Sequence, residues 1–258
     1  MSRALPDDNL GYPVLIKLSV GGFGSGFFVN TDKACYLVTA RHVLFDSEGN
    51  LLSPSCVLIS YGSDISQAAR NEISVDLNSA LESGRLLRHA DADVAVGRLG
   101  TIDGNKIELV TGCAFISKPG LVGVSRDSGI ELFKDVLISN DCYIFGYPNS
   151  LSFAPGSQFD YDKPLLRKGI VAGTDAARRT LILDCPVYWG NSGGPVVQVS
   201  HIANAMILKV IGVVSQFIPL VETWTNARQG IAHNELINSG YSVAVSMDPV
   251  IELIDQMS

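Results

Sequence analysis

Three short segments of the chain carry side chains that could together catalyse acyl transfer. Residues 190–195 read Gly-Asn-Ser-Gly-Gly-Pro, so Ser192 lies among glycines that leave its hydroxyl and nearby backbone N–H groups unobstructed. His42 follows a strand-like run at 36–39, and Asp93 opens the apolar run Val-Ala-Val. A nucleophile, a base and an orienting carboxylate are the three parts of this chemistry. We therefore expect His42, Asp93 and Ser192 to be catalytic.

Each segment alone has an ordinary explanation, namely a glycine-rich turn, a surface imidazole and a turn carboxylate. Their joint occurrence favours the catalytic interpretation. Asp93 is preferred to Asp91 because it directly precedes the apolar strand. The spacing Gly190-x-Ser192-x-Gly194 also fits the nucleophile elbow of α/β-hydrolases. That fold needs its Asp and His after the serine and a helix at this point, whereas the residues after Gly194 are typical of a strand.

The elements that must position these residues are predicted to be short strands. Runs rich in Val, Ile, Phe and Tyr alternate with Gly, Asn and Asp turns, which is typical of an all-β barrel or sandwich. The predicted strands cover residues 14–20, 26–29, 35–39, 56–61, 72–77, 93–99, 136–139, 143–145, 169–172, 180–184, 195–199 and 205–216.

A helix is predicted near the end of the chain, where Pro249 fits the first turn and Val250, Ile251 and Ile254 form an apolar stripe. Weaker helical patterns follow His42 and cover residues 64–71. Residues 223–239 are predicted to be a long polar connection that could border a substrate cleft.

Composition excludes several classes of protein. With 47% hydrophobic and 17% charged residues the chain is expected to fold around a full core. A net charge of −7 and no long basic run argue against nucleic acid or a membrane surface as a partner. The five cysteines form no C-x-x-C pair, and the four histidines lack metal-ligand spacing, so no metal or cofactor is expected. No signal-like or membrane-spanning segment is apparent, which favours a cytoplasmic location.

The three motifs and their chain order resemble the trypsin/chymotrypsin-like serine peptidases, through T-A-x-H at 39–42, D-V-A-V at 93–96 and G-N-S-G-G-P at 190–195. Residues 24–29 and 168–171 also resemble strands of the bacterial high-temperature-requirement (Deg-type) proteases. The resemblance covers about residues 12–256. It implies one peptidase domain with two six-stranded antiparallel β-barrels, at about 11–117 and 130–246, a connector at 118–129 and a C-terminal α-helix at 247–257.

The same resemblance implies a serine endopeptidase acting on polypeptides. Ser192 would attack the scissile carbonyl, and the N–H groups of Gly190 and Ser192 would form the oxyanion hole. The strand containing Ser215, Gln216 and Phe217 would bind the substrate backbone, and Ser215 would contact the aspartate. Pro186 would form the floor of the specificity pocket, where no acidic residue selects Lys or Arg. Small or medium apolar side chains are therefore expected on the acyl side of the cut bond.

One departure from the family pattern concerns activation. Asn191 stands where digestive members have an Asp that pairs with a newly cut N-terminus, so we expect no N-terminal cleavage to be needed. We expect no appended PDZ-type domain in this chain, which suggests control by an activating protein partner or by expression. A latent or non-catalytic domain that binds polypeptides remains the alternative function.

Overall fold

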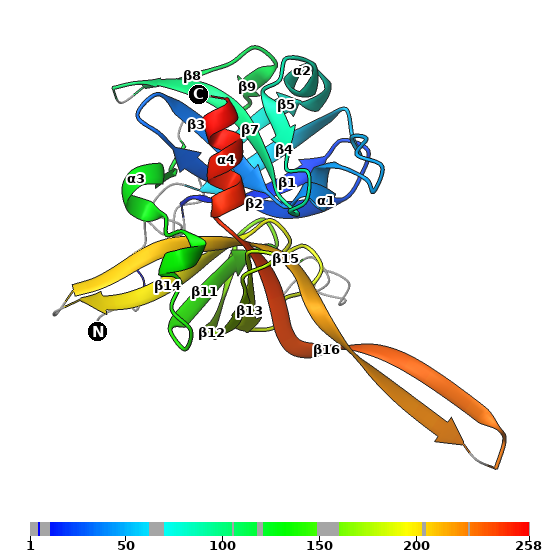
Figure 1. The fold of residues 1–258 in the computed structure, drawn as a ribbon. Coiled ribbons are helices and arrows are strands. Elements are labelled where there is room, and N and C mark those ends of the chain that lie inside the picture. The colour runs from blue at the N-terminus through cyan, green and yellow to red at the C-terminus, as the bar shows by residue number, and fades with distance from the viewer. Residues whose placement is uncertain are drawn as a thin grey trace.

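The structure is a computed structural model that describes residues 5, 11–61, 70–104, 106–117, 121–148, 160–202, 205–226 and 228–257. Two β-rich halves lie one above the other, and the C-terminal helix crosses the upper half (Figure 1). This bears out the prediction of an all-β chain that ends in a short helix. The division of the chain into domains stays a prediction.

The first half is a strongly curled sheet with the path β6–β7–β3–β2–β1–β4–β5–β9, while β8 pairs with β7 and β10 runs parallel to β2. This path is open over the residues described, so the expected closed six-stranded barrel is here a curled ten-stranded sheet. Its strands are β1 (Pro13–Leu18), β2 (Phe23–Asn30), β3 (Ala34–Thr39), β4 (Ser55–Tyr61), β5 (Arg70–Asp76), β6 (Leu86–Arg88), β7 (Ala95–Asp103), β8 (Lys106–Leu109), β9 (Cys113–Phe115) and β10 (Val124–Ser125). Its helices are α1 (Arg41–Leu44) and α2 (Leu77–Glu82).

The second half is the six-stranded antiparallel barrel that was expected, in the circular order β11–β12–β13–β16–β15–β14. Short helices α3 (Arg126–Gly129) and η2 (Phe133–Asp135) precede it, and α4 (Asp248–Gln256) follows it. The strands are β11 (Asp141–Gly146), β12 (Leu165–Asp175), β13 (Thr180–Asp184), β14 (Pro195–Ile202), β15 (Ala205–Asn226) and β16 (Ile231–Ser246).

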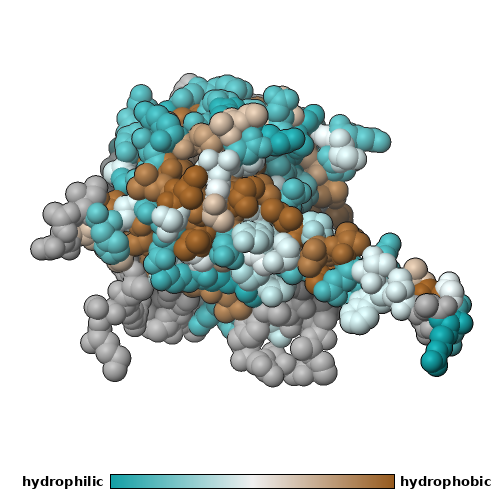
Figure 2. Space-filling view, turned by 60° about the horizontal axis from the view of Figure 1, so that its bottom comes forward, coloured by the Kyte–Doolittle hydropathy of each residue, from teal (hydrophilic) through white to brown (hydrophobic). Residues whose placement is uncertain are grey.

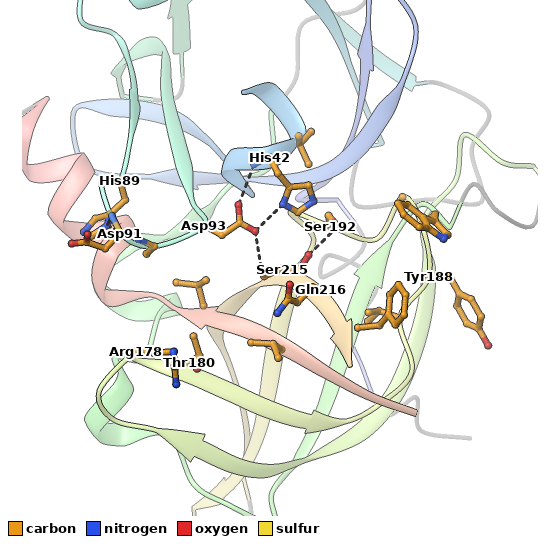
Figure 3. A pocket seen from close by; sticks show the side chains of 18 of the residues that line it. His42, His89, Asp91, Asp93, Arg178, Thr180, Tyr188, Ser192, Ser215 and Gln216 are labelled. Atoms are coloured by element: carbon orange, nitrogen blue, oxygen red, sulfur yellow. Dashed lines mark hydrogen bonds and ion pairs between the residues drawn. The ribbon is translucent and has the colours of Figure 1, made fainter. Parts of the chain in front are cut away.

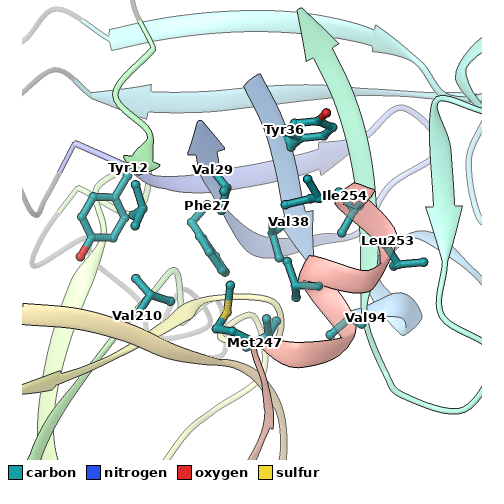
Figure 4. Packing of buried hydrophobic residues seen from close by; sticks show 14 of the residues in the cluster. Tyr12, Phe27, Val29, Tyr36, Val38, Val94, Val210, Met247, Leu253 and Ile254 are labelled. Atoms are coloured by element: carbon teal, nitrogen blue, oxygen red, sulfur yellow. The ribbon is translucent and has the colours of Figure 1, made fainter. Parts of the chain in front are cut away.

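A shared apolar layer holds the two halves together. Phe27 and Val38 of the curled sheet belong to the same buried cluster as Val245 and Met247 from the barrel side. Figure 4 shows the apolar face of α4, including Leu253, packed into this layer. Burial of such side chains is the main favourable term in folding, so this layer fixes the position of each half relative to the other.

Two sequence-based expectations need comment. The predicted connection at 223–239 is wrong: β15 and β16 continue through it as a paired hairpin with a turn at 228–230. A half-buried strand is recognised in a sequence by alternating apolar and polar residues. Neither face of this hairpin is covered, so its strands do not show that alternation. Of the weak helical pattern at 64–71, residues 64–69 lie outside the described residues, and residues 70 and 71 begin β5.

The five cysteines are free thiols, and all but Cys113 are buried. Burial raises the pKa of Cys35 to about 12. Within the described residues, no helix is long and apolar enough to cross a membrane. The cytoplasmic location stays a prediction.

Candidate active site

The pairing of β3 with β7 brings His42 to Asp93. The two strands are antiparallel and Thr39 faces Ala95, so the residues just after β3 and just before β7 meet at one end of the sheet. There His42 Nδ1 lies 2.8 Å from Asp93 Oδ2, and the His42 backbone N–H donates to Asp93 Oδ1 at 3.1 Å. The carboxylate therefore holds both the ring and the backbone of the histidine.

Asp93 has a third partner from the barrel. The hydroxyl of Ser215 donates to Asp93 Oδ2 at 2.6 Å, which joins β15 to the end of the curled sheet (Figure 3). Burial acts to raise the pKa of Asp93, but the hydrogen bond and charge of His42, the Ser215 hydroxyl and the His42 N–H together lower it below its ordinary value. Asp93 is thus kept ionised beside the imidazole.

Ser192 lies on the connection between β13 and β14. Gly193 has φ +88°, and a Cβ on it would lie 2.0 Å from the carbonyl oxygen of Ser25. Only glycine fits both conditions, so the loop can lie this close to Ser25 only with glycine at this position. The Ser192 hydroxyl donates to the Ser215 carbonyl at 3.1 Å, and no hydrogen bond to His42 is formed within the described residues. Figure 3 shows Ser192 beside the imidazole, within the same cluster.

Ser25, a buried residue of β2, holds the backbone around Ser192 at two points. Its hydroxyl donates to the Gly190 carbonyl at 2.6 Å and accepts from the Tyr147 N–H at 3.0 Å. Its backbone N–H donates to the Ser192 carbonyl at 2.9 Å. The Gly190–Asn191 and Ser192–Gly193 peptides are therefore fixed from the other half of the molecule. In the sequence Ser25 stands out only as part of the family-like strand at 24–29, because its role depends on a contact 165 residues away.

His89 organises the segment that carries Asp93. Its Nδ1 accepts the backbone N–H groups of Asp91 and Ala92, at 3.2 and 2.9 Å, which leaves Nε2 to donate to Glu252 of α4 at 3.1 Å. Arg179 also reaches Glu252, at 2.5 Å. Asp91 belongs to this structural network, while the contact with His42 is made by Asp93.

A comparison with known protein families identifies the family of this chain. Residues 24–201 match the family model described as trypsin-like peptidase domain, which is 178 of the 258 residues. The chain belongs to this family. The comparison with curated proteins gave no match.

Three solved structures show a similar fold at low identity. The HtrA-type protease AlgW with tripeptide is 14% identical, with a TM-score of 0.52, over 97% of this chain and 60% of its own. Deg5 is 17% identical, with a TM-score of 0.52, over 95% of this chain and 88% of its own. The thermostable serine protease AL20 from an extremophilic microorganism is 15% identical, with a TM-score of 0.53, over 98% of this chain and 99% of its own. This chain thus spans 60% of the length of AlgW, and these identities show the fold alone.

A cleft of about 1350 Å³ runs between the two halves of the peptidase domain and contains all three expected catalytic residues. Of the residues expected to bind substrate, Ser215, Gln216 and Phe217 line it. Pro186 is not among its described lining residues, where its neighbour Val187 is found instead. That Pro186 forms the floor of the specificity pocket stays a prediction.

Two aromatic residues border the cleft beside the substrate strand. Trp189 is 75% exposed, and its ring meets the ring of Phe217 edge to face at 6.3 Å between centroids. Phe217 was expected from the family resemblance to lie on the substrate-binding strand, whereas Trp189 was not singled out. In the described part of the chain no group of three or more His, Cys, Asp or Glu side chains could hold a metal ion.

Proposed function

We propose that this trypsin-like domain is a serine endopeptidase that uses Ser192 as nucleophile, His42 as base and Asp93 as the orienting carboxylate. The observation that supports this most strongly is the position of one ionised carboxylate, Asp93, which contacts His42 and Ser215 next to Ser192 in a single cleft. A carboxylate with only a structural role would not need to bind both the ring and the backbone N–H of a histidine at the surface of a cleft.

The chemistry follows from these positions. The Ser192 hydroxyl rotates from the Ser215 carbonyl toward His42 Nε2 and attacks the scissile carbonyl, while its proton passes to the imidazole. Asp93 keeps the proton on Nδ1 and stabilises the imidazolium. The N–H groups of Gly190 and Ser192 bind the oxyanion. His42 then protonates the leaving amine, and water hydrolyses the acyl-enzyme by the same route, which restores the Ser192 hydroxyl.

The polypeptide substrate would lie as an extended strand along Ser215, Gln216 and Phe217. β14 pairs with β15 up to Val213, and Gly193 and Gly194 extend this pairing to Val214. Beyond Val214 this edge of β15 has no strand partner among the described residues. An extended chain can add to such an edge through main-chain hydrogen bonds. Val187 and Phe217 make the adjoining wall apolar, which supports a preference for small or medium apolar side chains on the acyl side of the cut bond.

A fluorophosphonate probe, which reacts with activated serines, tests the proposal. The folded wild-type chain should be labelled, Ser192→Ala should not, and His42→Ala should react at least about 100-fold more slowly because its serine has no base. Ser200→Ala, on β14 outside the cleft, is the matched control and should label like the wild type. Absence of labelling in a folded wild-type chain would favour the alternative of a latent or polypeptide-binding domain.

Cleavage of a peptide library by the same preparations tests the specificity. Cuts should follow small or medium apolar residues and disappear in Ser192→Ala. Preferential cleavage after Lys or Arg would contradict the proposed pocket.

A further inference from the structure

The outer part of the β15–β16 hairpin projects beyond the barrel and is a surface of its own. We define the outer ribbon as residues 219–226 of β15 with 231–238 of β16, which pair in unbroken register. β14 pairs with β15 only up to Val213, and β13 pairs with β16 only from Tyr241 onward. Both long edges of the outer ribbon therefore lack a strand partner among the described residues (Figure 1).

The outer ribbon exposes apolar side chains on both of its faces. Val221 and Leu236 are directly opposite each other on one face and are 57% and 70% exposed. Trp224 on the other face is 63% exposed. Figure 2 shows hydrophobic residues at intervals along this projection with nothing covering them. An isolated two-stranded ribbon is only marginally stable in water. Exposed apolar side chains on such a ribbon therefore indicate a surface that binds a partner.

The β16 edge is the one open to another strand. The edge of β15 is interrupted by Pro219, which has no N–H to donate, and by a register shift between Phe217 and Pro219. Residues 231–237 read Ile-Ala-His-Asn-Glu-Leu-Ile, with no Lys, Arg or Pro and no register shift. Lysine, proline and bulges are the usual devices that stop edge strands from pairing, and this edge has none of them.

The charges on this edge are complementary to a second copy of themselves. Consider two β16 edges that pair antiparallel, with Asn234 opposite the partner subunit's Asn234, so that the numbers of facing residues add up to 468. His233 then faces Glu235 of the partner subunit, and Glu235 faces the partner subunit's His233. Within one chain Glu235 is directly opposite Glu222, an unfavourable pair of like charges. The imidazole supplied by the second copy would lie on the same face as these carboxylates and donate to one of them.

The apolar residues of the edge are complementary in the same register. Ile231 faces Ile237 of the partner subunit, and Ala232 faces Leu236 of the partner subunit, a small residue against a large one. Every position of the seven-residue edge thus meets a compatible side chain. A shift by one residue would place Glu235 opposite Asn234 and lose the ion pairs.

We propose that a second copy of this chain pairs with the β16 edge at residues 231–237, giving a twofold dimer whose two outer ribbons form one four-stranded sheet. The proposal is independent of the catalytic assignment, since none of these residues belongs to the cleft described above. Coverage by a different protein or by none is decided by the experiments below.

The first experiment measures the mass of the full chain by sedimentation equilibrium from about 1 to 100 µM. The wild type should approach twice the 27.6 kDa chain mass. His233→Glu should weaken the dimer at least tenfold, because it places two glutamates opposite each other twice. The exchange variant, His233→Glu with Glu235→His, has the same composition as the wild type and should restore the dimer. A chain that stays monomeric throughout, or an exchange variant as weak as the single one, overturns the proposal.

The second experiment tests the register by oxidation. In antiparallel sheets, residues directly opposite lie about 4.5 to 5.5 Å apart at Cα, which suits a disulfide. Asn234→Cys should form a disulfide-linked dimer on mild oxidation, because position 234 faces itself across the twofold axis. Thr223→Cys is the matched control: it pairs with Asn234 within the chain, is equally exposed, and lies on the other strand. Equal linkage of the two variants, or none, overturns the proposal.

Discussion

The inner and outer parts of β15 belong to one continuous strand but meet opposite surroundings. Val213 and Val214 are buried, face different apolar clusters and lie between β14 and β16. Ten residues further along, Trp224 is exposed, and this part of β15 pairs only with β16 among the described residues. Both parts therefore form a strand, and they differ in the number of elements that pack against them.

We therefore expect the two parts of β15 to have different functions. The Ser215 hydroxyl, which donates to Asp93 at 2.6 Å, belongs to a residue that is only 8% exposed and follows the buried Val214. The outer ribbon has no such support, and its exposed edges and apolar residues suit association better than catalysis. Substitutions in the inner part should consequently cost far more activity than substitutions in the outer ribbon.

The largest effect is expected from Asp93→Asn. The amide cannot hold the Nδ1–H tautomer of His42, and in Ser–His–Asp enzymes this change costs about 10⁴ in kcat. The kcat for a peptide substrate should fall to that extent while thermal unfolding changes little. Asp91→Asn, two residues earlier, should cost less than about tenfold. Equal losses in both variants would mean that the wrong carboxylate has been assigned.

Asn191→Asp should cost several kcal/mol of stability at neutral pH. Asn191 is 1% exposed, and its Oδ1 has no hydrogen-bond partner among the described residues. A buried carboxylate without a partner has its pKa raised above the ordinary value of about 3.9. The loss should therefore be nearly absent below about pH 4 and grow as the pH rises toward 7.

Denaturant unfolding of Asn191→Asp at several pH values measures this. Asn191→Ala is the control, because it removes the amide without adding a charge and its loss should not vary with pH. A pH-independent loss in the Asp variant would show that the carboxylate finds a cation or hydrogen bonds, as in family members that pair an Asp here.

Ser25→Ala should lower kcat about 10- to 100-fold with little change in KM. The variant removes the hydroxyl that holds the Gly190 carbonyl, so the adjacent oxyanion donors lose their fixed orientation. Affinity for a peptide boronate, which mimics the tetrahedral intermediate, should fall in parallel with kcat. Ser53→Ala removes a comparable buried hydroxyl, bonded at 2.7 Å to Ser55, and should lower stability alone. If both variants behave alike, Ser25 has only a structural role.

The sequence was sufficient to predict the local parts of the site. The segments at 39–42, 93–96 and 190–195 each carry a complete motif, and the all-β class and α4 followed from runs with clear periodicity. The six-stranded barrel was implied by the family resemblance. These features depend on residues close together in the chain. The roles of the three residues remain predictions until they are tested.

What the sequence could not predict depends on distant contacts. Ser25 matters because β2 meets the Gly190 turn, and no local pattern records that meeting. The outer ribbon was missed because pattern methods detect strands by a buried face, which this ribbon lacks.

The smallest effect on catalysis is expected from removing the outer ribbon. A variant that joins Pro219 to Asn238 through an Asn-Gly turn keeps the residues that line the cleft. No buried residue of the described chain lies between 216 and 241, so the melting temperature should change by less than about 2 °C. We expect kcat/KM for a short peptide to stay within about twofold, while the dimer is lost. A fall of more than about tenfold would mean that the inner and outer parts of β15 work together, and that association through the ribbon supports the cleft.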